Sequence, residues 1–152
     1  MIYFIDEDTI ENEPFVIELE KRGYQVEIIE NADDGLKRLK NARVNEVEAV
    51  ILDVMLASDE KQKSSFGARE TGDFVFTGLV LLDRISKIWK EKKIEHLKKR
   101  VILFSAAEEE QLIKDIENKA SEYKKSFLRK IDYSNSIDFA DDVEKVIKEQ
   151  GN

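Results

Sequence analysis

Acidic, hydroxyl and ammonium side chains stand directly after apolar segments of this 152-residue chain: Asp6, Glu7, Asp8, Asp53, Ser105 and Lys130. If these segments are strands of one parallel sheet, their carboxyl ends lie at one edge, where such sheets bind ligands. Carboxylates gathered there repel each other, and one lysine is too little charge to balance them. Magnesium, which prefers oxygen ligands, would suit this set. A hydroxyl and an ammonium group are the donors that a transferring phosphoryl group needs.

The run 48–56, Glu-Ala-Val-Ile-Leu-Asp-Val-Met-Leu, indicates how Asp53 is held. Its continuous aliphatic residues predict a strand over 48–53 that is buried on both faces, as in a parallel sheet. Asp53 would stand at the carboxyl end of that strand. The plainer interpretation of this acid is a loop cap, and the functional interpretation is a reactive carboxylate.

Five apolar runs predict strands, at 2–5, 25–29, 48–53, 101–104 and 126–128. Five helical patterns alternate with them, beginning near Thr9, Asn31, Gly78, Ala107 and Ser136. Thr9, Asn31 and Ser136 are capping residue types, and Gly23 ends the first helix. The last helix is expected to bury Ile137, Ala140, Val143 and Ile147. The alternation predicts an α/β fold, a doubly wound five-stranded parallel sheet with five helices on its two faces.

Composition excludes several classes of function. The formal charge of −8 disfavours nonspecific binding to nucleic acid or to an acidic membrane. The absence of cysteine excludes a thiol nucleophile or thiolate metal site, and the single histidine excludes a histidine-cluster zinc site. No apolar run is long enough to cross a membrane, so we expect a cytoplasmic protein. The length predicts one domain over residues 1–152.

Five short motifs occur in order along nearly the whole chain: Phe4-Ile5-Asp6-Glu7-Asp8, Ile51-Leu52-Asp53-Val54-Met55-Leu56, Thr77-Gly78-Leu79 with Leu81-Leu82, Ile102-Leu103-Phe104-Ser105-Ala106, and Phe127-Leu128-Arg129-Lys130. Through them the chain resembles the CheY-like receiver domain of two-component response regulators. The resemblance implies the flavodoxin-like (βα)5 receiver architecture. It also implies a cytoplasmic phosphoprotein of signal transduction, phosphorylated by a histidine kinase or by a histidine phosphotransfer protein of a phosphorelay.

The resemblance further implies a role for each matching residue at the acidic end of the sheet. Asp53 would be the phosphoacceptor. Asp6 and Glu7 would hold Mg²⁺ together with Asp53 and the carbonyl of Met55. Such a domain catalyses its own phosphorylation and dephosphorylation rather than acting as a classical enzyme.

A switch would follow from the same resemblance. Ser105 would move onto the phosphoryl group, and Lys130 would pair with it. Phe127 would reorient with Ser105 and alter the face formed by the fourth helix, the fifth strand and the fifth helix. The expected partner of that face is a downstream protein target, with a homodimer as an alternative, and neither nucleic acid nor membrane is expected to bind.

The chain departs from the receiver pattern at two prolines and in one loop. Ala57 and Ile131 stand where the family usually has proline. The family's bond after the lysine is typically cis, so either Ile131 tolerates a strained cis bond or the loop relaxes and Lys130 shifts. The connection 57–77 is extended and carries Phe66, Phe74 and Phe76, which is consistent with a flexible loop or with a lid.

Two other functions are consistent with parts of the pattern. A pseudo-receiver would have the same fold and bind partners regardless of phosphorylation. A haloacid-dehalogenase-type phosphatase would use Asp6 as its nucleophile, with Ser105, Lys130 and the pair Asp141-Asp142 in support. The phosphatase interpretation leaves Asp53 without a role and places the acidic pair inside a helical pattern.

The segment 91–100 is strongly basic and contains His96, the one histidine. It precedes a strand, so we expect it at the edge of the sheet opposite the acids, where a catalytic base could not reach them. Such a run usually only solvates a helix end, although it could contact an acidic partner or nucleic acid.

Overall fold

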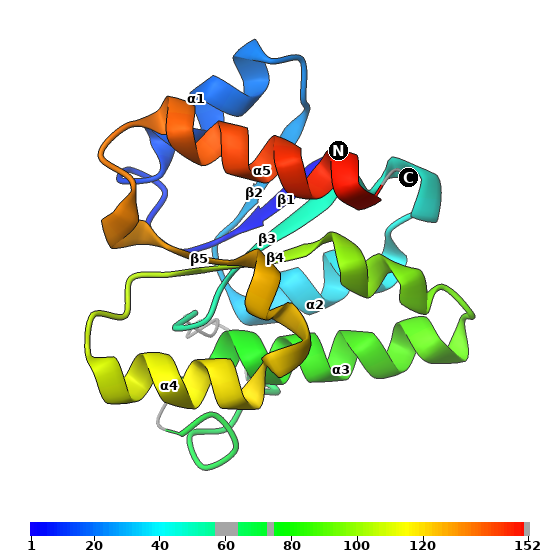
Figure 1. The fold of residues 1–152 in the computed structure, drawn as a ribbon. Helices are drawn as coiled ribbons and strands as arrows, with labels where there is room; N and C mark the ends of the chain where they lie inside the picture. Colours follow the sequence, from blue (N-terminus) through cyan, green and yellow to red (C-terminus); the bar gives the residue numbers. More distant parts are fainter. Residues whose placement is uncertain (57–63, 73–74, 151–152) are drawn as a thin grey trace.

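The computed structural model describes residues 1–56, 64–72 and 75–150 (Figure 1). Its strands are β1 (Ile2–Ile5), β2 (Val26–Ile29), β3 (Ala49–Asp53), β4 (Val101–Ser105) and β5 (Phe127–Arg129). Its α-helices are α1 (Glu13–Lys21), α2 (Ala32–Asn41), α3 (Thr77–Glu91), α4 (Glu110–Lys119) and α5 (Ser136–Gln150). Short 3-10 helices are η1 (Val44–Glu46), η2 (Glu95–Arg100), η3 (Ser121–Ser126) and η4 (Lys130–Asp132).

The strands form one parallel sheet in the order β2-β1-β3-β4-β5. The register places Ile5 beside Leu52 and Asp53 beside Phe104, so β3 ends one residue beyond β1, and β4 ends one residue beyond β3. Each connection crosses between parallel strands through a helix, as the alternation of strand and helix patterns predicts. The doubly wound five-stranded architecture predicted from the sequence is therefore confirmed.

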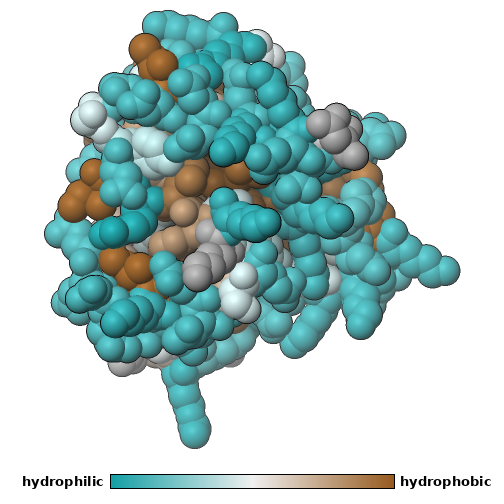
Figure 2. All heavy atoms as spheres, in the orientation of Figure 1, coloured by the Kyte–Doolittle hydropathy of each residue, from teal (hydrophilic) through white to brown (hydrophobic). Residues whose placement is uncertain are grey.

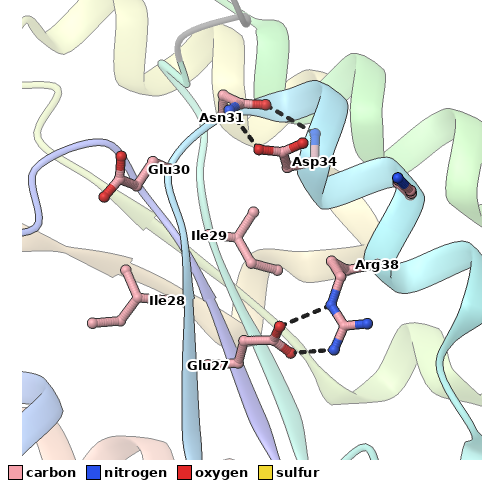
Figure 3. Close-up of a pocket in the computed structure, with 8 residues that line it drawn as sticks. Glu27, Ile28, Ile29, Glu30, Asn31, Asp34 and Arg38 are labelled. Atoms are coloured by element: carbon pink, nitrogen blue, oxygen red, sulfur yellow. Dashed lines mark hydrogen bonds and ion pairs between the residues drawn. The ribbon is translucent and has the colours of Figure 1, made fainter.

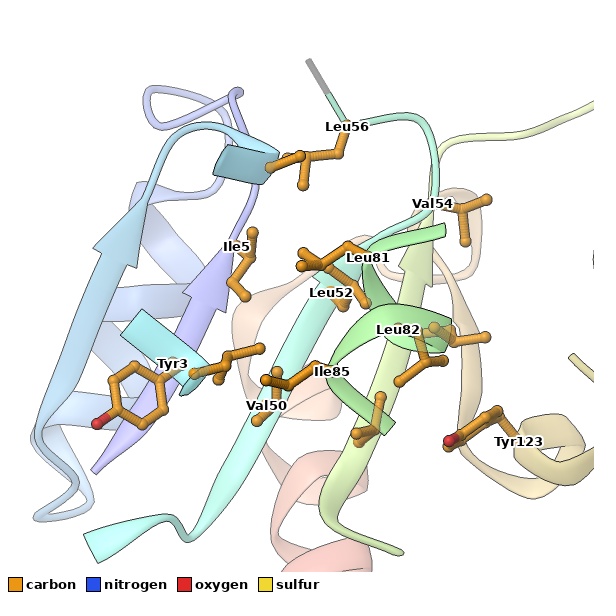
Figure 4. Packing of buried hydrophobic residues seen from close by; sticks show 14 of the residues in the cluster. Tyr3, Ile5, Val50, Leu52, Val54, Leu56, Leu81, Leu82, Ile85 and Tyr123 are labelled. Atoms are coloured by element: carbon orange, nitrogen blue, oxygen red, sulfur yellow. The ribbon is translucent and has the colours of Figure 1, made fainter. Parts of the chain in front are cut away.

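Helices cover both faces of the sheet. Helices α1 and α5 pack together on one face, and α2 and α3 pack together on the other (Figure 1). The α2–α3 side has an aliphatic core in which Leu52 of β3 meets Leu81 and Ile85 of α3 (Figure 4). The α1–α5 side is aromatic, with Phe104 of β4 and Phe139 of α5 at a ring-centroid distance of 4.8 Å.

Strand β3 is buried along its whole length, which is why its sequence has no polar alternation. Val50 and Leu52 belong to the core under α2 and α3, whereas Ala49 and Ile51 belong to the core under α1 and α5. Burying an aliphatic side chain of this size stabilises the fold by about 1.5–3 kcal/mol. The strand that carries Asp53 is therefore firmly held on both of its faces.

Of the three helix caps predicted from the sequence, one agrees with the structure and two differ. Asn31 caps α2 as predicted, because its Oδ1 accepts the Asp34 N–H at 2.9 Å. Thr9 does not cap α1, which begins four residues later with Asn12 at its N-cap position and Pro14 in its first turn. Ser136 is the first residue of α5, and the cap is Asn135, whose Oδ1 accepts the Asp138 N–H at 2.9 Å.

Three further expectations required correction in the second half of the chain. The predicted buried face of α5 is rotated: Ile137 is 56% exposed and Ile147 only partly buried, while Phe139 and Val146 join Ala140 and Val143 in the core. Strand β5 begins at Phe127, one residue later than predicted, so that Lys130 follows it directly. Helix α4 is also shorter than the predicted span 107–120.

Part of the extended connection after β3 is folded against the body of the molecule. The guanidinium of Arg84 on α3 stacks over the ring of Phe66 at 4.2 Å and binds Glu70 at 2.8 Å. Ser64 and Ser65 bond to Asp33 at the start of α2. The segment 64–72 is therefore fastened to both α2 and α3, while Ala57 and Phe74 lie outside the described residues and the choice between loop and lid stays open.

No helix in the described part of the chain is long and apolar enough to cross a membrane.

Candidate functional site

Four side chains predicted to act together do lie at one edge of the sheet. Asp6 follows β1, Asp53 ends β3, Ser105 ends β4 and Lys130 follows β5. Asp6, Asp53 and Ser105 are at most 5% exposed, and the Lys130 side chain is 14% exposed. Burial of two carboxylates, a hydroxyl and an ammonium group in one place is costly unless they satisfy one another.

Lys130 is bound to the acidic turn after β1. Its Nζ donates to Asp6 Oδ2 at 2.5 Å and lies 3.9 Å from Asp8 Oδ2. The other Asp6 oxygen accepts the Asp8 N–H at 2.9 Å, which closes a tight turn after the strand. The Lys130 ammonium also lies 5.3 Å from the centre of the Phe104 ring, a cation–π arrangement. The Lys130–Asp6 pair joins residues 124 positions apart in the chain.

The pKa of Asp53 is strongly raised. Burial and, after it, the nearby charge of Asp6 raise its pKa to about 7, while Lys130 and the Met55 N–H oppose the rise. That N–H donates to Asp53 Oδ1 at 3.1 Å. Burial alone would lower the pKa of Lys130, but Asp53 and Asp6 outweigh it and the net direction is upward. The site therefore holds more negative charge than one lysine neutralises.

This charge predicts a dependence of stability on pH in buffer without divalent metal. The pKa of Asp53 is about 7 in the folded state and 3.8 ordinarily, so the folded protein holds this proton more tightly than the unfolded chain does. The stability that results is fully present below about pH 4 and is lost as the pH rises through about 7. We expect wild-type protein to lose about 2 kcal/mol between pH 5 and pH 8 relative to Asp53→Asn. Urea unfolding at several pH values measures the difference. If the free energy of unfolding changed with pH in the same way for both proteins, ionisation of Asp53 would carry no cost in stability.

Ser105 ends β4, and Phe127 begins the neighbouring strand β5. Ser105 Oγ accepts the Ala107 N–H at 3.1 Å, so the hydroxyl itself begins the turn that leads to α4. Phe127 is half-buried beside Leu103 and packs against the core under α3, together with Leu112 and Ile113 of α4. Ser105 and Phe127 thus stand on the neighbouring strands β4 and β5, both of which lead to or from α4.

The peptide bond after Lys130 is trans, since no cis bond occurs among the described residues. Residues Lys130–Asp132 form a 3-10 turn, and Ile131 points outward with 59% of its surface exposed. Of the two outcomes expected from the missing proline, the relaxed loop is the one found. Lys130 nevertheless still reaches Asp6.

A magnesium ion would fit only part of the predicted ligand set. Among the described residues, no three acidic or histidine side chains converge closely enough to hold a metal on their own. Asp6 and Asp53 are buried together, whereas Glu7 and Met55 are exposed at the rim. The pKa of Glu7 is raised by partial burial and then by Asp8 and Asp6. Two carboxylates with a carbonyl and water are nonetheless a usual magnesium shell, because this ion keeps several waters.

Gly78 lies tightly against the end of β3, although the sequence predicted no contact between it and Asp53. Gly78 donates its N–H to the Val54 carbonyl at 2.8 Å, and a Cβ on Gly78 would overlap the Asp53 backbone carbonyl oxygen. A signal for this contact exists in the sequence, since a glycine in the first turn of an amphipathic helix is a poor helix former and indicates close approach. Phe104, whose ring lies near the Lys130 ammonium, could be predicted only as part of an apolar strand.

The acidic pair Asp141-Asp142, which would support a phosphatase, lies away from the candidate site. Asp141 binds Arg22 at 2.8 Å and Asp142 accepts the Tyr133 hydroxyl at 2.7 Å, so both serve contacts of α5. His96 is exposed in η2, directly before β4 and hence at the opposite edge of the sheet.

A groove of about 400 Å³ lies between β2 and the start of α2. The bidentate pair of Arg38 with Glu27, at 2.7 and 2.8 Å, closes one side of it, and Asn31 and Asp34 stand at the other (Figure 3). None of the strand-end residues of the candidate site lines this groove.

Comparison with solved structures yields receiver domains over the whole chain. A CheY-like response regulator receiver domain from Methanospirillum hungatei JF-1 is 19% identical, with a TM-score of 0.65 over 99% of this chain and 94% of that one. Response regulator TrrA from Thermotoga maritima, in complex with Mg²⁺ and BeF, is 20% identical, with a TM-score of 0.58 over 95% of this chain and 96% of that one. A response regulator from Burkholderia pseudomallei with a phosphorylated aspartic acid, a calcium ion and citrate is 16% identical, with a TM-score of 0.58 over 97% of this chain and 68% of that one.

No protein-family profile matches the chain, and no curated protein matches it. At these levels of identity the solved structures show the fold. The chain has the fold of CheY-like receiver domains, as its motifs predicted.

Proposed function

We propose that this chain is a phosphoacceptor signalling domain, a single receiver unit over residues 1–152, in which Asp53 receives a phosphoryl group. The donor is the phosphohistidine of a histidine kinase or of a phosphotransfer protein. The phosphorus–nitrogen bond of the donor breaks as a phosphorus–oxygen bond to an Asp53 carboxylate oxygen forms. The setting is a cytoplasmic two-component system.

One observation carries this proposal: Asp53 and Asp6 are buried together at the carboxyl edge, and the partly buried Lys130 is bonded to Asp6 at 2.5 Å. The single positive charge of Lys130 does not balance the acids around it. Such a cluster adds little to the stability of the fold, since even a balanced buried ion pair stabilises about as much as apolar packing of the same size. Perturbed carboxylates in such a place are typical of functional sites. The receiver fold supports the same assignment, because the motifs that resemble that family include these three residues.

Mg²⁺ would be held by Asp6 and Asp53 with the carbonyl of Met55, and by Glu7 or through water at the rim. When bound, it would neutralise charge on the phosphoryl oxygens and between the two carboxylates. The neighbour solved with Mg²⁺ and BeF supports this choice of ion. Lys130 is close enough to exchange its Asp6 partner for a phosphoryl oxygen, and Ser105 can donate its hydroxyl proton to another.

The output of the switch is proposed to be protein contact. Ser105 and Phe127 stand on neighbouring strands, so a rearrangement at the Ser105 hydroxyl would alter the face formed by α4, β5 and α5. Figure 2 shows hydrophobic side chains gathered beside β5 between hydrophilic surroundings on this face. A downstream protein or a second copy of the chain is the proposed occupant.

A phosphorylation-independent pseudo-receiver is the second candidate, because the trans bond after Lys130 and the exposed Glu7 both depart from the family pattern. Beryllofluoride, a phosphoryl mimic, distinguishes the two. With Mg²⁺ present, we expect it to bind and to shift the amide signals of Ser105, Phe127 and Lys130 in NMR spectra.

The same titration without Mg²⁺ is the control and should leave the spectrum unchanged. Absence of any shift with both Mg²⁺ and beryllofluoride present would eliminate the phosphorylation switch and leave the pseudo-receiver.

A further inference from the structure

A basic surface lies at the edge of the sheet opposite Asp53. Residues 87–100 contain seven basic and two acidic side chains, a net charge of +5, while the rest of the chain carries −13. They form the end of α3 and the turn η2, which leads directly into the amino end of β4. In Figure 1 this is the side where α3 ends, and Figure 2 shows it covered by projecting hydrophilic side chains. We call this surface the basic edge.

Most of the charge on the basic edge is not used by the fold. Lys90, Lys93 and Lys99 are exposed and form no ion pair with any residue in the described ranges, and Lys98, half-buried, forms none either. Lys92 donates to the Lys40 carbonyl at 2.6 Å, which brings the end of α2 alongside. Like charges held this close repel one another and weaken the fold.

Lys93 adds an independent observation, because its backbone is left-handed with φ of 60°. The Ile94 N–H bonds the Trp89 carbonyl at 2.8 Å and the Lys93 N–H bonds the Lys90 carbonyl at 3.1 Å, the Schellman pattern that ends a helix. Glycine is the usual residue at this position, since any side chain is strained there. The backbone conformation would favour glycine at this position, so the turn itself does not account for the lysine.

We propose that the basic edge binds a short acidic segment of a partner protein. The positive charge of the basic edge is confined to one edge of the sheet and is interrupted by Glu91 and Glu95. The surface is therefore suited to bind a few carboxylates rather than a long polyanion. A nucleic acid or an anionic membrane would extend over the surrounding surface, where the charge of −13 repels it. The partner would bind without covering Asp53, which stands at the other end of β3.

The test is fluorescence anisotropy with a labelled oligoglutamate peptide at low salt, on the whole chain. We expect salt-sensitive binding that Lys93→Gly weakens by about twofold to fivefold, the factor that one exposed ion pair contributes. The same substitution should raise the melting temperature by about 2 °C, because glycine relieves the left-handed strain. Added Lys99→Gln should weaken binding further, to about tenfold.

The matched control is Lys145→Gln, which removes one exposed lysine from α5. Its affinity should equal that of the wild type. No peptide binding at low salt, or equal weakening by Lys145→Gln, would overturn the proposal. So would tighter binding of single-stranded DNA or of phosphatidylserine vesicles than of the peptide. Phosphorylation of Asp53 is not involved, so the result is independent of the proposed function.

Discussion

Asp53→Asn is expected to reduce labelling of the protein by acetyl phosphate below detection. The substitution keeps the size of the side chain and the bond from the Met55 N–H, but an amide oxygen is not a nucleophile that can hold the phosphoryl group. It also removes one of the two carboxylates whose mutual repulsion raises the pKa of Asp53. The variant should therefore be folded and at least as stable as the wild type at neutral pH. Mass spectrometry of the intact protein measures the added phosphoryl group.

Asp6→Asn is the informative comparison, because the receiver interpretation makes Asp53 the nucleophile and the phosphatase interpretation makes Asp6 the nucleophile. In a phosphoacceptor at Asp53, loss of Asp6 weakens metal binding and frees Lys130, which lowers the labelling rate by about tenfold to a hundredfold without abolishing it. In a phosphatase with Asp6 as its nucleophile, Asp6→Asn abolishes labelling and Asp53→Asn does not. Labelling that survives Asp53→Asn would therefore refute the assignment of Asp53.

Gly78→Ala is expected to lower the free energy of unfolding by about 3 kcal/mol or more, because severe overpacking of a core has effects of this size. The added methyl group would overlap the Asp53 carbonyl oxygen and press on the α carbon of Val54. Neither atom belongs to a flexible side chain, so the backbone at the end of β3 or the start of α3 must move. Because that backbone carries Asp53, we also expect a slower reaction with acetyl phosphate. Urea unfolding and the labelling rate measure the two effects.

Gly67→Ala is the matched control for this substitution. Gly67 belongs to the same connection, and a methyl group there would meet nothing within 4 Å. Its effect on the free energy of unfolding should lie within about 0.5 kcal/mol of zero. If Gly78→Ala were equally mild, the contact between α3 and the end of β3 would be looser than its geometry indicates.

The sheet was predictable because its three central strands, β1, β3 and β4, are buried on both faces. An uninterrupted apolar run such as 49–52 is typical of a strand buried on both faces, and the alternation of such runs with helices favours parallel pairing. The same pattern places Asp6, Asp53, Ser105 and Lys130 at one edge, because each follows or ends a strand and parallel strands share their carboxyl ends.

The helix boundaries were less predictable because several residues compete for the same role. Thr9 and Asn12 are both residue types that favour the N-cap position, and the rigid ring of Pro14 favours the later start. Asn135 and Ser136 compete in the same way before α5, and a shift of the helix start rotates the face that meets the core. Partners in the ion pairs, such as Lys130 with Asp6, depend on side-chain conformations that no pattern encodes.

The hydrogen bond between Gly78 and Val54 ties together the two ends of the long connection after β3. Loops whose ends are pinned together tolerate changes of length cheaply, since doubling the number of residues costs only about 0.6 kcal/mol of closure entropy. Residues could thus be gained or lost beyond Leu56 without moving Asp53. The connection is a place where this fold can be elaborated, by evolution or by an engineer who inserts a sensor or an affinity tag, at the rim of the site.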